Sequence, residues 1–135
     1  MNHEGTKDTK LKLSPDQEAL AKDFVDAALK VHRALGPGLL ESAYRVCLAH
    51  ELTVRGHQVR QEQLLPVEYE GIKLDAGYRI DLVVDGLLVA ELKAVDSIPP
   101  VHKAQLMTYL RLSRIRLGFL VNFNAPLLRD GLQRF

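Results

Sequence analysis

The feature that most constrains the fold is a predicted β-hairpin over residues 79–93. Two apolar runs flank Asp85-Gly86, which is a strong signal for a tight hairpin turn. Successive side chains of a strand point to opposite faces of the sheet. In both runs the even-numbered positions are apolar, apart from the turn glycine, and the odd-numbered positions hold every charge. We therefore expect one face of the hairpin to pack in the core and the other to carry polar chemistry.

The parity of this pattern predicts the length of the hairpin loop. Even-numbered residues of both strands share a face only if paired positions have the same parity, and this requires an odd number of loop residues. We expect a three-residue loop, Val84-Asp85-Gly86, with a type I turn and a bulge at a left-handed Gly86. This register brings Asp81, Glu91 and Lys93 to one face at the same end of the hairpin.

The remaining patterns predict a single α/β domain around the hairpin. Ser14-Pro15-Asp16-Gln17 has the residues of a helix start, and apolar positions recur at helical spacing as far as Leu35. The elements predicted next are a helix over 40–55, strands within 57–74, a helix over 101–112 and a core strand over 115–123. We expect a mixed central sheet flanked by helices, formed by residues 14–135 and preceded by a flexible tail over residues 1–13.

Composition restricts the class of protein. No apolar run approaches the roughly 20 residues needed to cross a bilayer, so we expect a soluble, cytoplasmic protein without a membrane partner. The chain has 18 Lys and Arg residues against 17 Asp and Glu residues, which leaves a net charge of only +1. A nearly neutral domain binds nucleic acid weakly unless its basic residues cluster, so composition alone does not indicate DNA binding.

The predicted convergence of Asp81, Glu91 and Lys93 has a chemical consequence. Two neighbouring carboxylates repel each other unless a cation lies between them. Lys93 could serve, but a divalent metal would serve better, and oxygen ligands without a nearby His or Cys cluster suit Mg²⁺ or Mn²⁺. The alternative is an inert acid–base patch on a half-buried sheet. Glu41 has a purely structural explanation, because a carboxylate in the first turn of a helix stabilises that end of the helix by about 0.3–1 kcal/mol.

Three sequence motifs carry a resemblance to a known family. Asp81, followed ten residues later by Glu91-Leu92-Lys93, resembles the signature of the PD-(D/E)XK nucleases. The segment 105–109, Gln-Leu-Met-Thr-Tyr, is similar to the QxxxY element of RecB-like members of that superfamily. The segment 38–44 reads as GxxExxY, the name-giving motif of a small bacterial family placed in the same superfamily. Ile80 stands where the signature has proline, the least chemical member of the motif.

The resemblance implies a restriction-endonuclease-like fold and a role for each matching residue. Asp81 and Glu91 would bind Mg²⁺, which Mn²⁺ could replace, with the backbone carbonyl of Leu92 nearby. Lys93 would orient or activate the attacking water, and Glu41 would complete the outer metal shell. The candidate substrate-binding residues are Gln105, Tyr109, Tyr44 and Arg79. Further phosphate contacts chosen from their charge are Lys30, Arg33, Lys103 and Arg111.

The function implied is metal-dependent hydrolysis of phosphodiester bonds in nucleic acid, with DNA favoured. Such a hydrolase must supply a nucleophilic water and neutralise a dianionic transition state, which metal ions and a lysine accomplish together. The main alternative is a non-catalytic module that keeps the nuclease fold and acts as a binding or regulatory subunit. Another is hydrolysis of a different phosphoester in a shallow, closed pocket. Formation of a homodimer is one way in which so small a domain could build a groove for nucleic acid.

Overall fold

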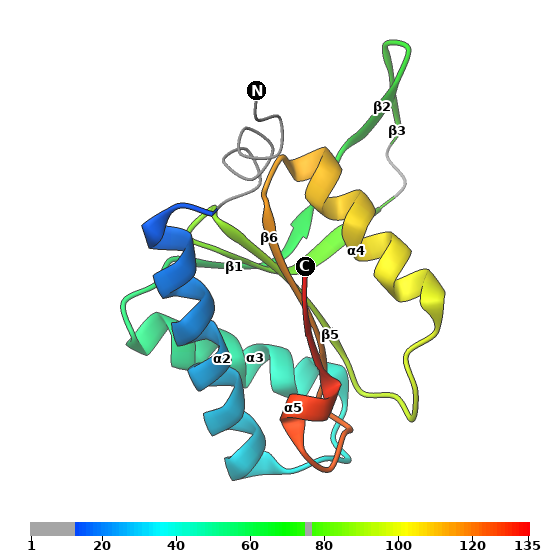
Figure 1. Cartoon of the computed structure of the whole chain (residues 1–135). Coiled ribbons are helices and arrows are strands. Elements are labelled where there is room, and N and C mark those ends of the chain that lie inside the picture. The colour runs from blue at the N-terminus through cyan, green and yellow to red at the C-terminus, as the bar shows by residue number, and fades with distance from the viewer. Residues whose placement is uncertain (1–12, 75–76) are drawn as a thin grey trace, which may run out of the picture.

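A five-stranded mixed sheet forms the centre of the computed structural model, which describes residues 13–74 and 77–135. The strand order is β1-β4-β5-β6-β7, with β5 and β6 parallel and the other neighbours antiparallel. The strands are β1 (Val59–Leu64), β4 (Arg79–Val84), β5 (Leu88–Lys93), β6 (Leu117–Asn122) and β7 (Leu132–Arg134). Figure 1 shows this sheet between helical layers, which confirms the expected α/β architecture of a central mixed sheet flanked by helices.

Helices α2 (Pro15–Leu35) and α3 (Glu41–Val54) cover one face of the sheet. Ser14 caps α2 as the sequence predicted, because its side chain and that of Gln17 each accept a hydrogen bond from the other residue's backbone. The even-numbered hairpin residues from Leu82 onward pack beneath these helices. The cluster also contains Phe24, Leu48 and Phe119, with Phe24 stacked on Phe119 at a ring-centroid distance of 4.9 Å.

Helix α4 (Pro100–Ser113) covers the other face, which the sequence predicted to carry the charged residues. Val83 and Val89, both odd-numbered, pack there with Leu106, Tyr109 and Leu110 of the helix. Much of this face is therefore a second core, which the alternation in the hairpin did not predict. The charged residues lie at the end of the hairpin, beyond these two valines.

Ile80 also packs on the α4 side, although its even number predicted the opposite face. The strand alternation is interrupted beside it. The β4–β5 ladder ends at the pair Leu82 and Ala90. On the other neighbour, β1, the pairing skips Glu62, whose φ is 49°. The irregular backbone on both sides of Asp81 explains the change of face.

The hairpin loop has three residues, as parity predicted, but it lies one residue further along the chain. Val84 pairs with Leu88, so the loop is Asp85-Gly86-Leu87. Asp85 and Gly86 have φ values of 54° and 65°, which confirms the left-handed Gly86. Two positive φ values identify a turn of the primed type rather than type I, because primed turns match the twist of the flanking strands.

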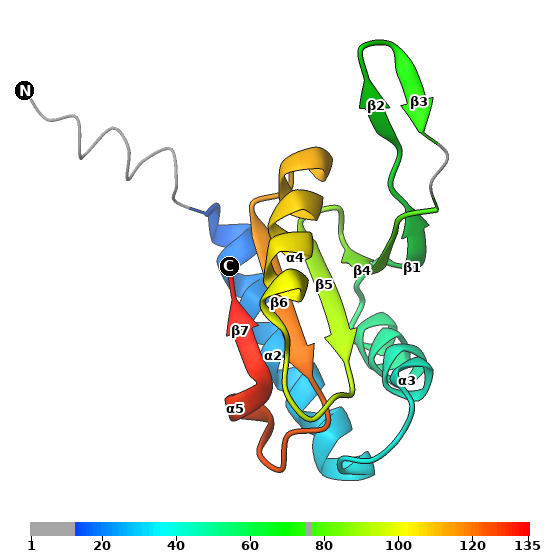
Figure 2. The ribbon, with the colours of Figure 1, turned by 90° about the vertical axis from the view of Figure 1, so that its right-hand side faces the viewer.

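Two further segments complete the described chain. Strands β2 (Val67–Tyr69) and β3 (Ile72–Leu74) form a separate hairpin that projects from the body in Figures 1 and 2. Helix α5 (Leu128–Gly131) and strand β7 close the C-terminal edge. The predicted tail falls on residues outside the described range, apart from Leu13, which packs against the core. Among the described residues, no helix combines the length and apolarity of a membrane span.

Candidate active site

At the open end of the β4–β5 hairpin, the carboxylates of Asp81 and Glu91 each accept a hydrogen bond from the backbone of the other strand. The Asp81 backbone N–H donates to Oε2 of Glu91 at 2.8 Å, and the Leu92 N–H donates to Oδ2 of Asp81 at 2.8 Å. These bonds occur just beyond the last regular pair, Leu82 with Ala90. Carboxylates replace backbone carbonyls as acceptors where the strands separate, and this fixes both side chains between β4 and β5.

The two carboxyl groups lie in an environment that disfavours their charged forms. Glu91 is only 4% exposed. Burial and the negative charge of Asp81 raise the pKa of Glu91 to about 8, against the opposing effect of the charge of Lys93. Burial likewise raises the pKa of Asp81, although the Leu92 N–H and Lys93 oppose the shift. A positive charge held between the two groups would stabilise both carboxylates.

Lys93 ends strand β5 two residues after Glu91, and its backbone is held from the neighbouring strand. It pairs with Asn122, and its carbonyl accepts from the Phe123 N–H at 2.8 Å. The buried Asn122 side chain also binds the backbone of Val95, accepting from its N–H at 3.1 Å and donating to its carbonyl at 2.8 Å. Asn122 thus fixes the chain that follows Lys93, and this positioning role was not predicted from the sequence.

Glu41 begins α3, where the adjoining loop is held by Tyr44. The Tyr44 hydroxyl donates to the Gly36 carbonyl at 2.5 Å and accepts from the Leu39 N–H at 3.1 Å. Its ring is fully buried and stacks on Phe123 at 4.5 Å. Tyr44, a predicted substrate-binding residue, therefore sits inside the core, where it orders the turn before Glu41.

Arg45 is a site residue that the sequence analysis missed. It follows Glu41 by four residues, and this spacing places two side chains on one face of a helix. Its guanidinium lies 3.4 Å from a Glu62 carboxylate oxygen, and its charge is among the influences that lower the pKa of Asp81. The helical spacing from Glu41 was the signal that could have identified it.

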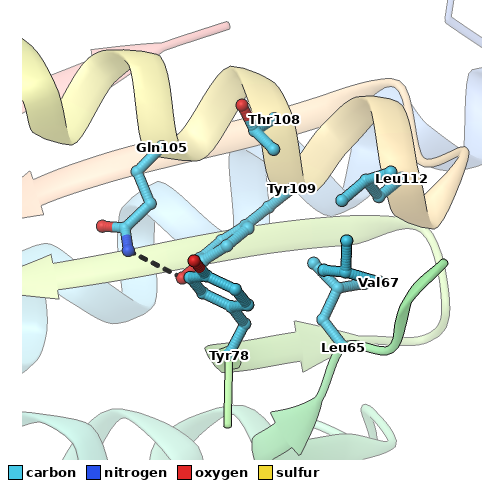
Figure 3. Close-up of a pocket in the computed structure, with 7 residues that line it drawn as sticks. All are labelled: Leu65, Val67, Tyr78, Gln105, Thr108, Tyr109 and Leu112. Carbon is cyan, nitrogen blue, oxygen red and sulfur yellow. Dashed lines mark hydrogen bonds between the residues drawn. The ribbon is translucent and has the colours of Figure 1, made fainter. Parts of the chain in front are cut away.

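Gln105 and Tyr109 approach the carboxylates from α4. The Gln105 amide donates to the Tyr109 hydroxyl at 2.8 Å, so the pair forms one polar unit, as Figure 3 shows. Burial, together with the negative charge of Glu91, raises the pKa of Tyr109. The structure thus brings the QxxxY residues next to the hairpin end that carries Asp81.

The basic candidates are distributed over both sides of the sheet. Arg79 is exposed at the start of β4, two residues before Asp81. Lys103 and Arg111 are exposed on α4. On the other side, the Lys30 ammonium lies 3.1 Å from Glu51 across α2 and α3, and Arg33 lies near the end of α2. Of the residues chosen from charge, those on β4 and α4 belong to elements that surround the carboxylates.

The donor set at the hairpin fits a hard divalent cation. Two carboxylates supply oxygen ligands, and Mg²⁺ typically takes one or two carboxylates while keeping several waters. Within residues 13–74 and 77–135, no group of three His, Cys, Asp or Glu side chains is close enough to enclose a metal. Glu41 is exposed and influences the pKa values of Asp81 and Glu91 from a distance. The fit therefore depends on the hairpin pair.

Comparison with known proteins agrees with this geometry. The family model described as the PD-(D/E)XK nuclease superfamily matches residues 18–135, a range that contains the hairpin, α3 and α4. Proteins of this superfamily generally use divalent metal ions. No curated protein and no solved structure matches the chain. Because the match extends over most of the sequence, the chain belongs to the PD-(D/E)XK nuclease superfamily.

Proposed function

We propose that this chain is a Mg²⁺-dependent nuclease that hydrolyses phosphodiester bonds of nucleic acid, with DNA as the favoured substrate. The observation that carries the proposal is the pair formed by the buried Glu91 and the half-buried Asp81. Each binds the other's strand at 2.8 Å, and Lys93 ends the strand of Glu91. Placing two carboxylates together away from water lowers the stability of the fold unless a cation neutralises them. The GxxExxY motif over residues 38–44 supports assignment to the family named after it.

Each residue of the hairpin has a distinct task. Asp81 and Glu91 would hold the metal ion through their carboxylate oxygens, with the Leu92 carbonyl available as a further ligand. When bound, Mg²⁺, or Mn²⁺ in its place, polarises a phosphoryl oxygen and lowers the pKa of a coordinated water. Lys93 donates a hydrogen bond to the attacking water or to the phosphate and stabilises the negative charge that develops there.

Residues around the hairpin position the metal and the substrate. Glu41 would contribute a carboxylate to the outer shell of the metal ion. Gln105 and Tyr109 contact the nucleotide next to the scissile bond. Arg79 and Arg45 supply positive charge for the phosphates on either side of the site. Since the net charge is only +1, such local clustering is what binding to a polyanion requires.

A cleavage assay tests this proposal. Labelled single- and double-stranded DNA and RNA are incubated with Mg²⁺ or Mn²⁺, and the original chain is compared with Asp81→Asn. The matched control is Asp26→Asn, which changes an exposed carboxylate on α2. We expect metal-dependent cleavage that the control retains and Asp81→Asn loses. If the original chain cleaves none of the substrates and calorimetry detects no metal binding, the chain is instead a non-catalytic module with a nuclease fold.

A further inference from the structure

A pocket of about 290 Å³ lies beneath α4 and is lined in part by Gln105 and Tyr109 (Figure 3). Its walls come from three separate parts of the chain. Tyr78 precedes β4, Leu65 follows β1 and Val67 begins β2, and α4 contributes side chains that include Thr108 and Tyr109. The metal and lysine chemistry described above uses only the edge that Gln105 and Tyr109 form.

The pocket lies beside the strand that carries Asp81. Tyr109 lines the pocket, and Tyr78, which also lines it, directly precedes β4. Tyr78 precedes Asp81 by three residues, which is about 10 Å along an extended chain. A nucleic-acid strand advances by about 3.4 Å per nucleotide in a duplex, so about three nucleotides span that distance. A strand bound at Asp81 could therefore place one of its nucleotides at the pocket.

The lining of the pocket suits a nucleobase better than a phosphate. None of the seven lining residues is Lys or Arg, which are the usual contacts of the phosphate backbone. Two tyrosine rings and aliphatic side chains instead offer surfaces for stacking. Tyr78 is 45% exposed, so its ring is accessible at the rim. The Gln105 amide can bind the polar edge of a base, and the volume lies near the lower limit of about 300 Å³ for ligand pockets.

We propose that this pocket holds one unpaired nucleobase of the strand being cleaved, stacked against Tyr78, and that the chain therefore prefers single-stranded nucleic acid. A paired base could enter only by leaving its stack, which costs a few kcal/mol. The proposal rests on the proposed nuclease function and adds the class of substrate. It also gives Tyr78, absent from all three sequence motifs, a role in binding.

The test compares base-containing and base-free strands of equal charge. Affinities for oligothymidylate, for an abasic oligomer of the same length and for a duplex are measured by fluorescence anisotropy. The Lys93→Ala background keeps the probes intact. Into it we introduce Tyr78→Ala, Tyr78→Phe or the control Tyr69→Ala, which removes a tyrosine that is 65% exposed on the projecting hairpin.

Loss of one base–aromatic stack lowers affinity by about 5- to 150-fold. We expect Tyr78→Ala to lose this much for oligothymidylate and nothing for the abasic oligomer or the duplex, while Tyr78→Phe and Tyr69→Ala keep the original affinity. Unchanged binding of oligothymidylate by Tyr78→Ala, or an equal loss for all three probes, would overturn the pocket assignment. Cleavage by the original chain is measured separately, so a failure of the nuclease assignment is distinguishable from a failure of the pocket.

Discussion

The carboxylates of the buried Glu91 and the half-buried Asp81 are in unfavourable surroundings when no cation neutralises them. Removing a carboxylate from water costs several kcal/mol, and a like charge beside it adds to that cost. The hydrogen bonds from two backbone N–H groups recover only part of this energy. Functional sites commonly keep such destabilising groups because the chemistry requires them.

This cost predicts the effect of Glu91→Gln on stability. The amide can still accept from the Asp81 N–H, and its NH₂ group can donate to the Asp81 carboxylate. At pH 8 without metal, we expect the variant to raise the free energy of unfolding by about 1–3 kcal/mol, as measured by urea denaturation. Glu70→Gln, on the exposed β2–β3 turn, should leave it unchanged.

Addition of Mg²⁺ should reverse the order of stability of the original chain and Glu91→Gln. A ligand that binds only the folded state raises its stability. The original chain and Glu70→Gln should therefore gain stability with Mg²⁺, and Glu91→Gln should gain little. Destabilisation by Glu91→Gln in metal-free buffer, or an equal gain with Mg²⁺, would contradict the role assigned to this pair.

At the scale of elements, the sequence predicted the hairpin, the helices that flank the sheet and strand β6, but not the second core under α4. The alternation of apolar residues determined the parity, and the structure confirmed an odd loop. Its position was missed by one residue because Asp85 adopts a positive φ that few non-glycine residues take. The second core under α4 was missed because Val83 and Val89 had been assigned to the charged face.

Elements that depend on distant contacts were also missed or left open. Strand β7 has only three residues and pairs with β6, so its local sequence carried a weak signal. The turn that leads into β7 requires glycine at position 131, because an added Cβ would lie 2.4 Å from the Asn122 carbonyl oxygen. The pocket beside Tyr78 joins three separate segments, and no motif or periodicity predicts such a meeting.

A charged contact links α2 to the hairpin turn and gives stability a pH dependence. Nδ1 of His57 lies 2.7 Å from a carboxylate oxygen of Asp85, and Nε2 contacts Asp23 of α2. Burial lowers the pKa of His57, but the bonds to Asp23 and Asp85 outweigh it and the net pKa is raised. Because the folded pKa exceeds the unfolded value, the stabilisation is complete below about pH 6.5 and is lost as pH rises through the folded pKa.

We therefore expect this contact to contribute a fall of about 0.5–1 kcal/mol in the free energy of unfolding across this range, a figure reduced for the partial exposure of the three side chains. This fall adds to the one caused by Glu91, whose pKa is raised to about 8. Urea denaturation from pH 6 to 9 would measure this fall, because that range brackets the ordinary His pKa of about 6.5. His57→Gln should remove this component, and His50→Gln, at an exposed position of α3, should keep it. Equal pH profiles for His57→Gln and the original chain would contradict the assignment.

At the scale of the whole molecule, the candidate site lies where the two layers meet. Helix α3 brings Glu41 and Arg45 from one side, α4 brings Gln105 and Tyr109 from the other, and the hairpin between them carries the carboxylates. The sequence motifs identified most of these positions because each motif is short and local. The roles of Tyr44 and Asn122 required the tertiary structure, and the homodimer remains a prediction.

The most direct test of the central claim separates metal binding from catalysis in Lys93→Ala. Calorimetry measures Mg²⁺ binding, and single-turnover assays measure cleavage of the substrate that the original chain cleaves fastest. Lys22→Ala, an exposed lysine of α2, is the control. We predict that Lys93→Ala binds Mg²⁺ as the original chain does and cleaves about 10²–10³-fold more slowly, the loss expected for one group that stabilises transition-state charge. Cleavage by Lys93→Ala at the original rate would contradict the account.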